Sequence, residues 1–350
     1  MLVELFGSAL VAALISAAAC RAIIALGPLD TPNAPRHAHT NPTPTSGGIG
    51  IALGFAAGML ALALLSDMFS AEITPRGVLL MAIASGFSIV FLLVGFWDDA
   101  RPLSASLKFA IFAALSILAA IIVGPVSIFP VGDGAWTAPA WAALMGTALW
   151  VFVMVNTVNF MDGANGLAMG SVAIGLIALA AISFVAGRYS AVALTACSVG
   201  AIVGFLVWNF PRGLLFAGDS GALFTGALAA LVSLIVIHRT GLSPVVPAIV
   251  FFPLLADALL TLAWRMYKRH SLLDGHSEHV YQILIRGGLS HAEVALLYWI
   301  AMALCGGIGF LVAEDAGVFA WVALASLAFL AVTASTIVRR FASRAKVGGV

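Results

Sequence analysis

Charged side chains are scarce in this sequence. Only 9% of its 350 residues are Asp, Glu, Lys or Arg, whereas 62% are hydrophobic. A soluble domain usually carries about 25% charged residues, so the composition excludes an ordinary water-soluble fold. The alternating strands that build membrane β-barrels are also absent, and the chain therefore predicts membrane-spanning helices.

Cysteines and basic clusters are equally sparse. Cys20, Cys197 and Cys305 each fall in or at the end of an apolar stretch, without Cys-x-x-Cys or Cys/His spacing, so we interpret them as packing residues. The formal net charge is +1 and the one basic cluster is a short tail at 339–350. Such a tail favours a membrane-surface anchor and gives no indication of nucleic-acid binding.

Long apolar stretches are abundant. A spanning helix needs about 20 mostly apolar residues, and about eleven stretches meet this requirement. A cleaved signal ending near Cys20 is the alternative for the first of them, but Glu4 and the lack of an early Lys or Arg disfavour it. We predict an all-α, polytopic integral membrane protein forming a single transmembrane domain over 1–350. The stretches run approximately over 3–26, 46–66, 77–96, 106–124, 140–158, 166–186, 190–208, 220–237, 245–266, 292–312 and 317–338.

The Lys and Arg residues are divided unevenly between the two sides of this arrangement. With eleven helices, 13 of the 16 fall on one side and only Arg76, Arg188 and Arg239 on the other. The positive-inside rule makes the richer side cytoplasmic, with the N-terminus outside and the C-terminus in the cytoplasm. The predicted cytoplasmic loops are approximately 27–45, 97–105, 159–165, 209–219 and 267–291.

These loops carry polar residues that a simple turn does not need. Oxygen ligands of this kind suit a hard cation such as Mg²⁺, which bridges one or two carboxylates to phosphates. Helix capping is the alternative for any single carboxylate, but the placement of all of them on one side disfavours capping alone. The four carboxylates and two amides are Asp98, Asp99, Asp162, Asp219, Asn159 and Asn165.

Basic side chains close to these carboxylates suggest phosphate binding. Lys108 follows Asp99 by nine residues, about two and a half helical turns, so it can face the same cavity. Snorkelling to the membrane surface is the alternative. His276 and His279 share a face if their segment is helical, as metal ligands or phosphate-binding cations would, although histidines are also common in ordinary loops.

Asp257 is the only carboxylate deep within an apolar stretch, where ionised groups usually mark function. Thr261 and Arg265 follow on the same helix face, and a structural contact between helices is the alternative. A secondary transporter would also use such a carboxylate, but it would keep its binding groups near the midplane. A non-catalytic membrane scaffold would not need four carboxylates on one face.

Five segments, in chain order, resemble the bacterial polyprenyl-phosphate N-acetylhexosamine-1-phosphate transferases of glycosyltransferase family 4. The segment GFWDDARPLSASLK resembles the family's Asp-Asp motif with its downstream basic residue. NTVNFMDGANGL resembles its Asn-x-x-Asn-x-x-Asp-Gly motif, and GDSGALFTG resembles its third-Asp motif. PLLADALLTLAWR and GHSEHVYQIL resemble its late helix and its histidine loop.

The resemblance implies transfer of N-acetylhexosamine-1-phosphate from a UDP-sugar to undecaprenyl phosphate, with release of UMP. Mg²⁺ would be the cofactor, with Mn²⁺ as a substitute. We expect the enzyme in the bacterial inner membrane, with its site facing the cytoplasm. The expected partners are a UDP-N-acetylhexosamine, undecaprenyl phosphate and the lipid bilayer, with a homodimer as an open alternative and no nucleic acid.

The resemblance also assigns roles by position. Asp98, Asp99 and Asp219 would be the catalytic residues. The assigned contacts are metal binding for Asp219 and Asn159, diphosphate binding for Lys108 and His276, the uridine region for Asp162 and Asn165, and the attacking lipid phosphate for Asp98 and Asp99. Further substrate-binding residues would be His279, Arg36 and His39.

The chain departs from the family pattern in two loops. The histidine loop lacks the triple-His pattern of the transferase that handles muramoyl-pentapeptide, which argues against the peptidoglycan step. It is closer to the His-Arg-x-His-Leu-Tyr-Gln form of enzymes that start O-antigen or other surface polysaccharides, although Ser277 replaces the usual Arg. In the first loop, Thr45 stands where the family often has a basic residue, which leaves the roles of Arg36 and His39 less defined.

Overall fold

The computed structural model describes residues 1–26, 29–30, 43–65, 73–132, 134–271, 275–314 and 317–344. Within these ranges the chain is almost entirely helical, and the strands form only two short antiparallel pairs, β1 with β2 and β3 with β4. The predicted all-α polytopic fold is confirmed. In chain order the elements are α1 (Leu2–Leu26), β1 (Leu29–Asp30), β2 (Thr43–Pro44), α2 (Gly47–Leu65), α4 (Pro75–Ala100), α5 (Ala105–Val123), β3 (Ile128–Val131), β4 (Gly134–Thr137), α6 (Ala140–Met161), α7 (Leu167–Val185), α8 (Tyr189–Asn209), α9 (Gly218–Thr240), α10 (Val245–Val250), α11 (Phe252–Tyr267), α12 (Val280–Arg286), α13 (His291–Leu311) and α14 (Val318–Arg344).

Ten helices of the described chain are long and apolar enough to span a membrane. They correspond to ten of the eleven predicted stretches. The remaining stretch, predicted at 245–266, is broken into α10 and α11. Pro253 stands in the first turn of α11, where its missing N–H is tolerated, but it cannot donate to a carbonyl of α10. The physical reason for the break is therefore local, and an apolar average over the stretch does not reveal it.

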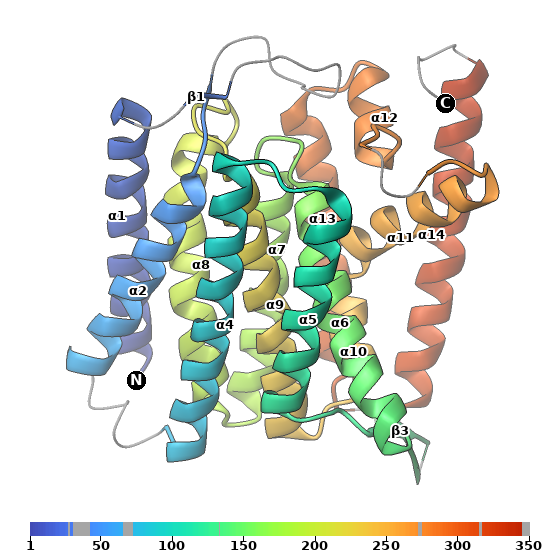
Figure 1. Ribbon diagram of the computed structural model, residues 1–350. Coiled ribbons are helices and arrows are strands. Elements are labelled where there is room, and N and C mark those ends of the chain that lie inside the picture. The colour runs from blue at the N-terminus through green and yellow to red at the C-terminus, as the bar shows by residue number, and fades with distance from the viewer. Residues whose placement is uncertain are drawn as a thin grey trace.

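The chain crosses the bundle alternately in the two directions (Figure 1). Helix α1 begins at the lower end of the view and α14 ends at the upper end, so α10 and α11 together act as one crossing. The connection from α4 to α5, the one from α6 to α7 and helix α12 all lie at the upper end. The structure thus gathers the polar loops at one end of the bundle, as alternation of eleven spans predicts.

Helix α9 forms the centre of the bundle. Its membrane-spanning window is entirely buried, and α2, α4, α6, α7 and α8 all pack against it. Its sequence, GDSGALFTGALAAL, is rich in Gly, Ala, Ser and Thr. Small residues let helix backbones approach closely in a membrane, where packing and hydrogen bonds replace hydrophobic burial as the force that drives association.

Two glycines hold neighbouring helices against the first turn of α9. A Cβ atom at Gly95 of α4 would lie 2.5 Å from the backbone carbonyl of Asp219. A Cβ atom at Gly48 of α2 would overlap the backbone nitrogen of Gly221. Only glycine permits these approaches, which place the start of α9 directly beside the end of α4.

Candidate active site

Asp98 and Asp99 occupy the last turn of α4, where the helix dipole disfavours negative charge. Other parts of the chain compensate for this position. Both oxygens of Asp99 accept hydrogen bonds from the first turn of α9, from the N–H groups of Asp219 at 2.9 Å and Ser220 at 3.1 Å. Asp99 is therefore a helix cap, as the capping alternative proposes, but it caps α9, more than a hundred residues further along the chain.

Lys108 joins Asp98 to Asp219. Its ammonium forms an ion pair with Asp98 and lies 3.2 Å from Oδ2 of Asp219. Asp98 also accepts a 2.7 Å hydrogen bond from the N–H of Leu103, which fixes the turn between α4 and α5. Asn159, near the end of α6, donates from Nδ2 to Oδ1 of Asp219 at 2.9 Å. Four helices thus bring polar groups into contact: α4 and α9 each supply a carboxylate, α5 supplies an ammonium and α6 supplies an amide.

Asp162, just after α6, adds a fourth carboxylate. Its carboxyl group has no hydrogen-bond partner among the described residues. Burial raises the pKa of Asp162 well above its usual value, and the charges of Asp219 and Asp99 raise it further. The group therefore lies in an environment with excess negative charge.

This donor set fits a divalent cation bound together with phosphates. Among the described residues Lys108 contacts Asp98 and Asp219, whereas Asp162 is influenced by the charges of Asp219 and Asp99, so a cation here would relieve the repulsion that Asp162 experiences. No three His, Cys, Asp or Glu side chains of the described chain are grouped closely enough to hold a metal alone. Mg²⁺ does not need such a cage, because it keeps waters and binds one or two carboxylates and substrate phosphates. Asp219 and the amide oxygen of Asn159 are suitable donors.

Asn165 belongs to the loop that follows Asp162. This loop is held in place by Asn209, a residue that was not predicted from the sequence. The Asn165 side chain donates to the carbonyl of Pro211 at 3.1 Å. Buried Asn209 accepts from the N–H of Gly166 at 2.6 Å and donates to the carbonyl of Leu215 at 2.8 Å. The signal for Asn209 was an amide at the end of an apolar stretch, directly before the Phe-Pro-Arg-Gly turn.

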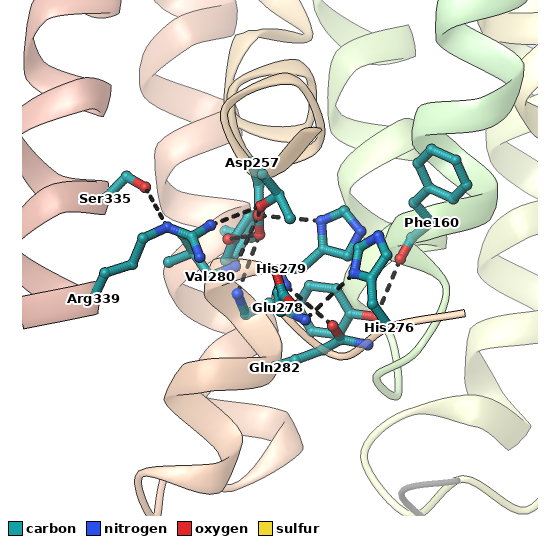
Figure 2. A network of polar contacts seen from close by, with 12 residues as sticks. Phe160, Asp257, His276, Glu278, His279, Val280, Gln282, Ser335 and Arg339 are labelled. Atoms are coloured by element: carbon teal, nitrogen blue, oxygen red, sulfur yellow. Dashed lines mark hydrogen bonds and ion pairs between the residues drawn. The ribbon is translucent and has the colours of Figure 1, made fainter. Parts of the chain in front are cut away.

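The two predicted histidines lie just before α12, and His279 is its N-cap residue. Their segment is not helical, yet their rings stack at a centroid distance of 5.0 Å. His279 is buried with Nδ1 3.4 Å from Oδ1 of Asp257, whereas His276 is partly exposed (Figure 2). The His279 ring also packs at 5.9 Å from Phe160, the residue that follows Asn159. The histidine loop therefore lies against the end of α6, the helix that carries Asn159.

His276 differs from the expected phosphate-binding cation. Burial, with a smaller contribution from the neighbouring His279 and Arg265, lowers the pKa of His276 to about 4. The free protein therefore holds this imidazole neutral near pH 7. A neutral ring still offers one N–H to a phosphate oxygen.

Two of the predicted substrate-binding residues, Arg36 and His39, lie outside the described residues. One basic residue was placed wrongly: α14 continues to Arg344, so Arg339 is not part of an anchoring tail. Arg339 is buried and donates to the Thr261 hydroxyl at 2.9 Å. A Lys/Arg count cannot distinguish a buried arginine from one that anchors the chain at the surface.

Comparison with known proteins identifies the family. A family model described as Glycosyl transferase family 4 matches residues 80–237. A phospho-N-acetylmuramoyl-pentapeptide-transferase of Mycobacterium leprae is 30% identical over 315 residues, which cover 79% of this chain and 85% of the relative. A probable undecaprenyl-phosphate N-acetylglucosaminyl 1-phosphate transferase of Bacillus subtilis is 27% identical over 283 residues, 80% of this chain and 76% of the relative.

A decaprenyl-phosphate N-acetylglucosaminephosphotransferase of Mycobacterium tuberculosis is 29% identical over 301 residues, 77% of this chain and 73% of the relative. Two of these relatives are named for the transfer of N-acetylglucosamine phosphate to a polyprenyl phosphate, and the third for the transfer of phospho-N-acetylmuramoyl-pentapeptide. With the motifs in order and the carboxylate cluster at one end of a membrane bundle, the chain belongs to glycosyl transferase family 4, among the polyprenyl-phosphate hexosamine-1-phosphate transferases.

Proposed function

We propose that this protein transfers N-acetylhexosamine-1-phosphate from a UDP-sugar to undecaprenyl phosphate at the cytoplasmic surface of a bacterial inner membrane. The observation that carries the proposal is the convergence of Asp98, Lys108, Asn159 and Asp219 from four helices at one end of the bundle. A site at the membrane surface can receive a soluble nucleotide sugar and a lipid phosphate together.

The reaction is a displacement at phosphorus. An oxygen of the lipid phosphate bonds to the phosphorus that carries the sugar, and the bond from that phosphorus to the bridging oxygen of UMP breaks. Such transfers need positioning and charge neutralisation more than covalent help. Mg²⁺ held by Asp219 and Asn159 would supply part of that neutralisation when bound, with Mn²⁺ as a substitute. Lys108 would place an ammonium, and His276 an N–H, beside the diphosphate.

A general base is not required for this step. A phosphate monoester has its second pKa near 6, so the attacking lipid phosphate is already mostly ionised at neutral pH. Asp99 is engaged by the amides of α9, and Asp98 by Lys108 and Leu103. We therefore propose that Asp98 orients the lipid phosphate and that Asp99 fixes α9. An aspartyl-phosphate route would instead give ping-pong kinetics and release UMP without lipid.

The identity of the transferred sugar is a separate part of the proposal. An N-acetylglucosamine donor is supported by the names of the Bacillus subtilis and Mycobacterium tuberculosis relatives. A muramoyl-pentapeptide donor is the second candidate, because a relative of that name matches at 30% identity. The missing triple-His pattern favours the first, and with it the first membrane step of O-antigen or another surface polysaccharide.

The transporter hypothesis loses its main support. Asp257, the intramembrane carboxylate that favours it, accepts hydrogen bonds from the backbone of α12 and from Tyr298. A carboxylate with these partners is not available to a transported solute.

The test is turnover by the purified protein in detergent with undecaprenyl phosphate and Mg²⁺. Labelled UDP-N-acetylglucosamine, UDP-N-acetylgalactosamine and UDP-muramoyl-pentapeptide are supplied separately, and UMP and lipid-linked product are measured. We expect equimolar UMP and lipid-linked sugar from an N-acetylhexosamine donor. Turnover of only the pentapeptide donor would replace the proposed sugar, and turnover of none would refute the proposed reaction.

A further inference from the structure

Asp257 contacts the histidine loop through the backbone of α12. Its Oδ1 accepts the N–H of Val280 at 2.8 Å and its Oδ2 accepts the N–H of Tyr281 at 3.1 Å. These are the first two N–H groups of α12, which have no partner within their own helix. Asp257 is 5% exposed, so it caps α12 from inside the protein.

The same carboxylate contacts two side chains. The Tyr298 hydroxyl of α13 donates to Oδ2 at 2.6 Å, and His279 Nδ1 lies 3.4 Å from Oδ1. A carboxylate beside one ring nitrogen fixes the orientation of an imidazole and the nitrogen that carries its proton. The His279 ring in turn stacks on the His276 ring, so the two histidines lie side by side.

The loop is linked from its other side to the predicted active site. The Tyr281 hydroxyl donates to the carbonyl of Phe160 at 3.1 Å, and its oxygen fills the space above Gly163 that a Cβ atom would occupy. Phe160 and Gly163 flank Asn159 and Asp162. A displacement of α12 would therefore also shift the chain around Asn159 and Asp162.

Two buried arginines, Arg265 and Arg339, complete this network, and Figure 2 shows Arg339 beside Asp257. Arg339 of α14 donates to the Thr261 hydroxyl at 2.9 Å, and that hydroxyl donates to Asp257 at 3.2 Å. Arg265 pairs with Glu278, next to His279, at 2.9 Å. Two arginines therefore accompany the two carboxylates Asp257 and Glu278, a pairing of opposite charges that is typical of a buried structural network.

We propose that Asp257 is a positioning residue: it fixes α12 and the stacked histidines, and so presents His276 to the sugar diphosphate. This inference rests on the proposed function for the role of His276. Asp257 itself contacts neither substrate, because its oxygens are enclosed by α11, α12 and α13.

The first test measures the loop without turnover. We expect amide hydrogen exchange in 280–286 to be faster in Asp257→Asn, and moderately faster in Tyr298→Phe, than in the wild type. Thr147→Val is the matched control, because Thr147 is a buried side chain that accepts the backbone N–H of Val126 at 2.8 Å, outside this network. It should leave exchange in 280–286 unchanged. Unchanged exchange in Asp257→Asn would overturn the proposal.

The second test is a double-mutant cycle on turnover. Asp257→Asn should lower kcat/KM for the UDP-sugar by about 10- to 100-fold and leave KM for the lipid phosphate near the wild-type value. In a His276→Ala background the same substitution should have at most a few-fold effect, because the residue that it positions is gone. Asp257→Glu should recover part of the activity.

An equal loss from Asp257→Asn in both backgrounds would show a general structural role and overturn the proposal. If the wild type turns over no donor, the proposed function fails, whereas the exchange rates still decide whether Asp257 holds the loop.

Discussion

Asp98 and Asp99 are adjacent in the chain but do different work. Asp98 pairs with Lys108 at the candidate site, whereas Asp99 accepts the amides of Asp219 and Ser220. The sequence predicts the meeting of Lys108 with the carboxylates, because nine residues of turn and helix limit where its ammonium can lie. It could not predict the cap at Asp99 or the partners of Asp257, since these contacts join residues far apart in the chain.

The carboxylate of Asp219 should be indispensable to turnover. Asp219→Asn preserves the size of the side chain but removes the charge that Lys108 contacts and that a bound cation would require. We expect kcat to fall by at least about 100-fold, measured as UMP release at saturating Mg²⁺. Exposed Glu314→Gln is the control and should keep full activity. Full activity in Asp219→Asn would exclude it from the reaction.

The neutral His276 should make stability depend on pH. The pKa of His276 is about 4 in the folded protein and about 6.5 in an unfolded chain. The unfolded state therefore binds the extra proton between these values, and this contribution to stability is complete above about pH 6.5 and lost as the pH falls toward 4. The unfolding temperature in detergent should fall less between pH 7 and pH 5 in His276→Gln than in the wild type. An identical fall in both proteins would contradict the lowered pKa.

Among the elements, uninterrupted helices were easy to predict and the broken one was not. Ten apolar stretches became ten spanning helices, because in a bilayer a long apolar segment must satisfy its own backbone hydrogen bonds. The stretch at 245–266 is also mostly apolar, but its helix breaks before Pro253. Its second part, α11, carries Asp257 toward α12. Hydropathy shows how long an apolar stretch is. It does not show the break between α10 and α11, because that break depends on a single residue, Pro253.

The close contact between α4 and α9 should be required for the site. Gly95→Ala would bring a methyl group against the backbone of Asp219 and push the start of α9 away from Asp99. We expect transfer to fall by about 100-fold and the unfolding temperature to decrease. Gly86→Ala, in the same helix with nothing within 4 Å, should change neither. Equal behaviour of the two variants would show that this contact does not position α9.

At the scale of the whole molecule, the alternating direction of the helices places the candidate site residues at one end of the bundle. In the part of the chain that the structure describes, ten spanning helices and the broken pair α10 and α11 bring the connections after α4, α6 and α8 to the same end as α12 (Figure 1). This arrangement could be predicted because it follows from the number of spans. The distribution of Lys and Arg adds the prediction that this end faces the cytoplasm.

The most direct measurement is transfer in sealed vesicles of known orientation that contain undecaprenyl phosphate. A UDP-sugar does not cross a bilayer, so it reaches only the sites on the outer surface of a vesicle. We expect inside-out vesicles to form lipid-linked sugar and release UMP, and right-side-out vesicles to do so only after permeabilisation. Transfer by intact right-side-out vesicles would reverse the orientation, and no transfer by either kind after permeabilisation would contradict the assignment of this end of the bundle as a transferase site.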